Sequence, residues 1–241
     1  MMRYFPLLAL AVLPLAGQTA ALSAHSPTPP ALLVELYSSE GCNSCPPADA
    51  WLGMLGRYGP RVIPLALHVP YWDGLGWRDR FAQSAFETRQ RQLAAANGRG
   101  FVYTPGVFAN GREFADWHRD SALRERLADV GTNAPQLRLE ASVDVGTIAA
   151  TLAADSLRPG EQLRLALAQD GLVSRVQAGE NAGVTLHHQH VVRAWQGPWT
   201  TLQAHARFQL PANGGALTLV GWVERTANGQ VLNAVALPLP H

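Results

Sequence analysis

Two cysteines, Cys42 and Cys45, are the residues of this 241-residue chain whose types and spacing most directly suggest chemistry. They are its only cysteines, and Asn43 and Ser44 separate them. A disulfide between them would close a very short loop, and disulfide stabilisation shrinks with loop length. A structural zinc site normally takes four ligands, often as two such pairs, and this chain has one pair. The spacing also suits a disulfide that forms and breaks with little backbone movement, so the flanking sequence must decide.

The flanking residues predict a strand before the pair and a helix after it. The segment 31–39 reads ALLVELYSS, an apolar run typical of a buried strand. Two prolines follow Cys45 and suit a first helical turn, where the missing N–H removes no hydrogen bond. A second apolar run over 61–69 completes a β-α-β unit, which implies a right-handed parallel crossover. Because a helix start stabilises a thiolate, this order favours a redox-active pair, with Cys42 attacking and Cys45 resolving.

The rest of the first half predicts two further helices and a hairpin. Helices are expected over about 84–97 and 121–130. Between them, the segment 101–114 reads FVYTPGVFANGREF. It predicts a strand that contains Pro105 and then a hairpin that turns at Asn110-Gly111.

The pattern changes after Pro135. Apolar and polar residues alternate over 137–145, 163–167 and 202–210, and a final hairpin is expected to turn at Asn228-Gly229. Alternation at such short intervals predicts an antiparallel sheet. The length of this half is typical of a β-sandwich.

The first half resembles the thioredoxin fold. The resemblance lies in the order strand, C-x-x-C at a helix start, strand, helix, and then Thr104-Pro105 entering a hairpin. It implies that Pro105 is cis and faces the disulfide. The dipeptide between the cysteines is Asn-Ser where thioredoxins have Gly-Pro, and Gly41 replaces an aromatic residue. These inner residues help to set redox poise, so the direction of exchange stays open.

Longer segments resemble an uncharacterised family of secreted bacterial proteins, the domain of unknown function 1223, thioredoxin-like in its N-terminal half. They read VELYSSEGCNSCPPADAWL, HVPYWDGLGWRDRFAQSAFETRQRQLA, VYTPGVFANG and GENAGVTLHHQHVVRAW. The implied fold is an α/β thioredoxin-like domain over 32–134, carrying the C-x-x-C pair. An all-β antiparallel, sandwich-like domain over 135–241 follows it. The family supplies no established reaction, so function must be argued from the site.

Glu35 is a candidate catalytic carboxylate inside the first apolar strand. Thioredoxins keep a buried carboxylate in the corresponding strand at nearly the same offset from the pair. Such a group has a raised pKa and can accept the proton of the resolving thiol. The alternative is a Glu35 that faces solvent at the sheet edge, because the register differs by one residue.

An aromatic loop after the second strand supplies candidate substrate-binding residues. Tyr71, Trp72 and Trp77 can line a groove beside the disulfide or can simply pack the loop against the body. Thr104 joins them, because its backbone beside a cis Pro105 would be open for pairing with a partner.

The histidines raise the question of a metal. His68 can act in acid–base chemistry, ligate a metal or fill a core position. His187, His188 and His190 lie close together in sequence, and two of them fall on one strand face. Without further ligands we predict neither a metal nor another cofactor.

The N-terminal sequence and the net charge limit the possible location of the protein and its possible partners. Residues 1–24 read as a secretory signal, and 25–31 as a flexible segment with three prolines. The formal net charge is +1, which gives no footprint for nucleic acid or for an anionic membrane. We therefore expect a periplasmic or secreted protein that contacts no membrane once the signal is removed.

Two functions compete on this sequence. The first is a thiol-disulfide oxidoreductase acting on protein or small-molecule thiols through Cys42 and Cys45. The second is a binding protein in which the pair is a structural disulfide or, together with His68, a metal-capture site. The exposure of Cys42 is expected to discriminate between them, because an attacking thiol must be reached.

Overall fold

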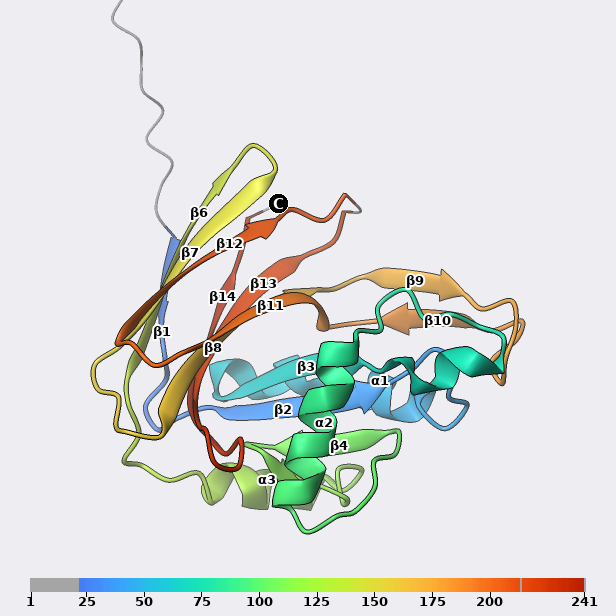
Figure 1. Ribbon diagram of the computed structural model, residues 1–241, viewed down its shortest axis with the longest axis horizontal. Helices are drawn as coiled ribbons and strands as arrows, with labels where there is room; N and C mark the ends of the chain where they lie inside the picture. Colours follow the sequence, from blue (N-terminus) through green and yellow to red (C-terminus); the bar gives the residue numbers. More distant parts are fainter. Residues whose placement is uncertain (1–21, 213, 241) are drawn as a thin grey trace, which may run out of the picture.

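A computed structural model describes residues 22–212 and 214–240 (Figure 1). Its largest feature is an eight-stranded mixed sheet. In spatial order the strands are β14 (Val231–Pro238), β13 (Leu217–Arg225), β8 (Glu161–Gln169), β11 (Val191–Trp199), β3 (Val62–His68), β2 (Leu32–Ser38), β4 (Gly106–Ala109) and β5 (Arg112–Glu113). Strand β3 pairs in parallel with both β2 and β11, and the other neighbours in this sheet are antiparallel.

The predicted fold class was wrong. An α/β thioredoxin-like domain followed by a separate all-β domain would place the two halves of the chain in different sheets. Instead, Ala66 of β3 is paired with Val191 of β11, so one sheet draws strands from both sides of residue 135. The chain is mostly β, with 41% strand and 20% helix. The apolar run that the sequence assigned to a small α/β unit is an interior part of a larger sheet.

A second sheet packs against one end of the first. It has the order β1 (Leu22–His25), β6 (Leu137–Asp144), β7 (Thr147–Ala154) and β12 (Gln203–Gln209), all antiparallel. Its alternating inward side chains, such as Leu139, Leu152 and Phe208, pack on residues of β8, β13 and β14. The period-two alternation therefore predicted strands correctly, and the structure shows no helix among the described residues after 135.

The helices cover both faces of β2 and β3. Helix α1 (Pro46–Gly53) packs on one face with η1 (Leu55–Arg61), a 3-10 segment, while α2 (Ser84–Ala96) packs on the other. Helix α3 (Asp120–Ala128) lies on the α1 face. Alternate residues of β2 explain this: Val34 and Leu36 contact the α1 side, whereas Leu33 and Tyr37 contact the α2 side. No helix of the described ranges is long and apolar enough to span a membrane.

The predicted turns are confirmed. Asn110 and Gly111 both have positive φ (47° and 76°) between β4 and β5, and Gly229 (φ 67°) turns the chain between β13 and β14. Such values suit the tight turn of a hairpin, where asparagine and glycine are favoured.

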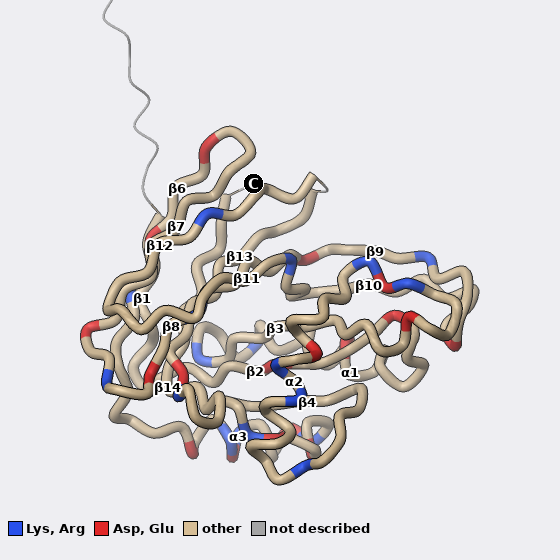
Figure 2. Tube along the Cα trace, viewed as in Figure 1, with Lys and Arg blue, Asp and Glu red and all other residues tan. Residues whose placement is uncertain are grey.

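Figure 2 shows charges of both signs spread over the elements.

The structure describes only part of the N-terminal segments predicted from the sequence. The expected signal segment 1–24 lies outside the described residues as far as residue 21, and Leu22–His25 form β1. In the expected flexible segment 25–31, Ser26 is buried and its amide bonds to the carbonyl of Leu137 at 2.9 Å.

Candidate functional site

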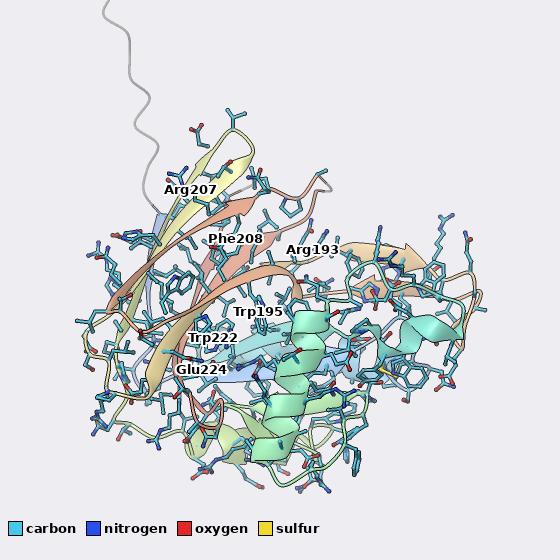
Figure 3. The ribbon with its side chains drawn as sticks, viewed as in Figure 1. Arg193, Trp195, Arg207, Phe208, Trp222 and Glu224 are labelled. Carbon is cyan, nitrogen blue, oxygen red and sulfur yellow. A yellow bond between two sulfur atoms is a disulfide. The ribbon has the colours of Figure 1, made fainter. Side chains whose placement is uncertain are left out.

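Cys42 and Cys45 form a disulfide at the start of α1, with their Cα atoms 5.5 Å apart (Figure 3). Cys45 is the N-cap of that helix, and its carbonyl accepts the amides of Ala48 and Asp49 at 2.9 and 3.1 Å. Both cysteines are 0% exposed. The predicted role of Cys42 as the attacking thiol requires an accessible sulfur, but the structure buries it, because other segments pack over the loop that carries it.

Trp72 is one of the residues that pack over this loop. It belongs to η2 (Pro70–Leu75), the 3-10 segment that follows β3. A methyl group at Gly41 would come within 3.0 Å of Trp72 Cβ, and Trp72 Nε1 donates to Thr104 Oγ1 at 2.8 Å. Trp72 thus connects the cysteine loop with Thr104. An aromatic residue in place of Gly41 would collide with it.

The Thr104-Pro105 peptide bond is cis, as predicted. Gly106 of β4 is paired with Tyr37 of β2. Pro105 therefore lies at the end of the sheet where β2 ends and the loop to Cys42 begins.

The other aromatic candidates use their polar atoms inside the protein. Trp77 Nε1 donates to Glu40 Oε2 at 2.7 Å, and Tyr71 Oη donates to Gln90 Oε1 at 3.3 Å. Both side chains are half-buried. The structure thus places Trp72 and Trp77 against the cysteine loop, whereas Tyr71 lies against α2.

Glu40 is fully buried two residues before Cys42. Burial alone would raise the pKa of its carboxyl, but contacts with His188, Ser174 and Trp77 bring that pKa below its ordinary value. His188 Nε2 lies 3.2 Å from Glu40 Oε1. A buried, ionised carboxylate therefore links the cysteine loop to Trp77 and His188.

His68 and Asp79 form a second buried pair beside the first. His68 Nδ1 lies 2.6 Å from Asp79 Oδ2, and the same oxygen accepts the amide of Glu40 at 2.9 Å. Burial would lower the pKa of His68, but Asp79 raises it to about 8. His68 Nε2 is buried without a hydrogen-bond partner among the described residues, and its ring packs on those of Phe81 and His188.

Asp49 is a site residue that the sequence reading missed. It follows Cys45 by one helical turn, so the two side chains share a face of α1. Ser38 Oγ donates to Asp49 Oδ2 at 3.1 Å. Burial raises the pKa of this carboxyl above its ordinary value. An acidic residue in a first helical turn is common, so nothing in its type or spacing marked it as part of the site.

Glu35 lies elsewhere. Its carboxylate is buried on the α2 face of β2, where Arg89 binds it through Nε at 2.6 Å and through Nη2 at 3.1 Å. Arg89 Nη1 also pairs with Glu224 at 2.8 Å, and Figure 3 shows Glu224 with Trp222 beside α2. The cysteines lie on the α1 side, so the sheet separates Glu35 from them.

The histidine-containing segment contributes to the site through β9 (Leu172–Arg175) and β10 (Thr185–His188), which form a two-stranded sheet. His188 reaches Glu40, whereas His187 is exposed and His190 pairs with Asp170 at 3.1 Å. Among the described residues, no group of three or more His, Cys, Asp or Glu residues is placed to hold a metal ion.

Comparisons with other proteins show a family and a similar structure. A family model described as a protein of unknown function (DUF1223) matches residues 33–224. A crystal structure of a protein from Agrobacterium tumefaciens is similar, with 25% identity and a TM-score of 0.62. That likeness covers 87% of this chain and 97% of the other. No curated protein matched the chain.

Proposed function

This chain belongs to the DUF1223 family, whose function is unknown, and we propose that it is a thiol-disulfide oxidoreductase acting through Cys42 and Cys45. One observation carries the proposal: the disulfide lies at a helix start beside a cluster of titratable groups, of which Glu40, His68 and Asp79 are buried and Asp49 is partly exposed. Burying such groups is unfavourable, and a structural disulfide does not require them. Groups with perturbed pKa values gather at sites that move protons.

The chemistry assigns a role to each thiol. In the reduced protein, the Cys42 thiolate attacks a partner disulfide, forms a mixed disulfide and releases one partner thiolate. The Cys45 thiol gives its proton to Asp49, and the resulting thiolate attacks the Cys42 sulfur. The Cys42–Cys45 disulfide forms, the second partner thiolate leaves, and two electrons have passed to the partner. The reverse sequence oxidises a dithiol.

The partners are proteins or small molecules that carry thiols or disulfides. The proposal places the protein in the periplasm or outside the cell, on the strength of the N-terminal signal pattern over 1–24. A disulfide is stable in such oxidising compartments, so turnover there needs an exchange partner.

A specific observation favours a second candidate function. Both sulfurs are buried, as in a structural disulfide of a non-enzymatic binding protein. The same observation does not favour metal capture with His68, for which no group of three ligands is placed among the described residues.

Trapping of mixed disulfides tests the proposal. In the Cys45→Ser protein the resolving thiol is absent, so attack by Cys42 should leave partners attached. We expect adducts in the exported fraction that reductant releases, and none with Cys42→Ser. Absence of adducts in both variants would count against the oxidoreductase. A stoichiometric metal that is lost when both cysteines are replaced, or an activity that this replacement leaves unchanged, would favour the binding protein.

A further inference from the structure

The β9–β10 sheet and its connecting loop, residues 172–188, form an arm that holds the cysteine loop. Asn181 is the central contact: its Nδ2 donates to the carbonyls of Cys42 and Glu40, both at 2.9 Å. Asn181 is only 5% exposed. One amide group of the arm therefore fixes the backbone on both sides of Gly41.

Other contacts of the arm surround this one. The amide of Asn43, between the cysteines, donates to Glu180 Oε2 at 3.2 Å. At the other end of the arm, His188 reaches the buried Glu40 carboxylate. The arm thus touches the loop before, at and after Cys42.

The arm is joined to the body by its two chain junctions and by side-chain packing, with Leu172, Ser174 and Leu186 buried on its inner face. In the described part of the chain its strands pair only with each other, and Figure 1 shows them extending beyond the ends of β8 and β11. Gly171 and His190 stand at the two junctions, both with positive φ (72° and 58°). Closing elements commonly turn about a few residues at the ends of strands.

We propose that this arm controls the access of thiol or disulfide partners to Cys42, and that Asn181 is the positioning residue that holds it closed. The inference rests on the proposed function. Exchange requires a partner sulfur to reach a sulfur that is 0% exposed here, so the loop must first open. Opening by movement of the arm breaks both hydrogen bonds of Asn181, and the open population therefore limits the rate.

The rate at which dithiothreitol reduces the disulfide tests the arm. Oxidised protein is mixed with excess reductant, and free thiols are alkylated at intervals and counted by mass spectrometry. Asn181→Ala removes two hydrogen bonds and should speed reduction by about 10- to 100-fold. Asn181→Asp keeps the shape but removes the donors, and it should be at least as fast. Glu180→Ala changes an exposed residue and should give a smaller acceleration, about two- to five-fold.

Asn233 provides a matched control. It is also buried, and its Nδ2 also donates twice, to Ser26 Oγ at 3.1 Å and to the carbonyl of Pro135 at 2.8 Å. Asn233→Ala should lower the free energy of unfolding at least as much, because Asn233 Oδ1 also accepts the amides of Ala31 and Ala234. It should leave the reduction rate unchanged, because none of its hydrogen-bond partners belongs to the arm or to the cysteine loop.

The outcomes separate the arm from the proposed function. Equal reduction rates in the wild type, Asn181→Ala and Glu180→Ala would overturn the proposal that the arm controls access to Cys42. Equal acceleration in Asn233→Ala would overturn it as well. Dithiothreitol reduction requires no turnover. Fast reduction of Asn181→Ala with no adducts in Cys45→Ser would therefore support the arm and count against the oxidoreductase. Adducts without acceleration would do the reverse.

Discussion

His68 Nδ1 lies 2.6 Å from Asp79 Oδ2, and neither side chain is more than 1% exposed. Asp79 raises the pKa of His68 to about 8, above the ordinary value of 6.5. The protonated pair therefore stabilises the fold fully below about pH 6.5, and this stabilisation is lost as the pH rises through about 8.

We expect the free energy of unfolding to be about 2 kcal/mol larger near pH 6 than near pH 9, through this pair alone. Denaturant unfolding of the wild type and of His68→Gln at both pH values measures it. The difference between the two proteins should shrink as the pH rises. A difference that grows with pH would contradict the assignment.

Gly41→Ala should disturb the contact that covers the cysteine loop. The new methyl group would meet Trp72 Cβ at 3.0 Å, so Trp72 or the loop must shift by a few tenths of an ångström. Overpacking of this kind costs about 1–3 kcal/mol, measurable by denaturant unfolding. Gly56→Ala is the control, because nothing lies within 4 Å of the added group. Equal stability of Gly41→Ala and Gly56→Ala would show that Trp72 does not confine the loop.

Glu35→Gln should weaken the fold and spare the thiol chemistry. The substitution leaves Arg89 buried with one carboxylate, Glu224, where it had two. Loss of one buried charge partner lowers the free energy of unfolding by about 3 kcal/mol. The dithiothreitol reduction rate should not change, since the sheet lies between Glu35 and the cysteines. Unchanged stability with impaired exchange would restore Glu35 as the proton acceptor.

Asp49→Asn should slow the resolving step, because the amide cannot accept the Cys45 proton. We expect mixed disulfides with glutathione to persist at least about ten-fold longer near neutral pH. The deficit should shrink at higher pH, where hydroxide removes the proton. Asp144→Asn, at an exposed position of β6, is the control. A lifetime equal to that of the control at every pH would exclude Asp49 from the step.

The sequence predicted single elements well and the assembly poorly. Apolar runs and alternation marked β2, β3 and, after residue 135, β6, β8, β12, β13 and β14, because these patterns depend on neighbouring residues. The pairing of Ala66 with Val191 depends on segments far apart in the chain. No local pattern specifies which strand lies beside which. The strands could therefore be predicted correctly while the fold class, an α/β domain followed by an all-β domain, was wrong.

The sequence predicted the cysteine pair of the candidate site but not the residues that surround it. The C-x-x-C spacing and the helix start identified Cys42 and Cys45. The contact of Asn181 with the cysteine loop could not be predicted from the sequence, since it depends on how the arm folds back onto the loop. Glu35 was singled out for being acidic in an apolar strand, and the partner that explains it, Arg89, is contributed by a helix later in the chain.

Catalysed exchange tests the central claim most directly. A model peptide disulfide is incubated with glutathione and substoichiometric protein, and the peptide thiol formed is measured over time. We predict that the wild type accelerates reduction through many turnovers, and that Cys42→Ser and Cys45→Ser each return the rate to the uncatalysed level. A wild-type rate equal to that of the double Cys42→Ser, Cys45→Ser protein would contradict the proposal that this pair performs thiol-disulfide exchange.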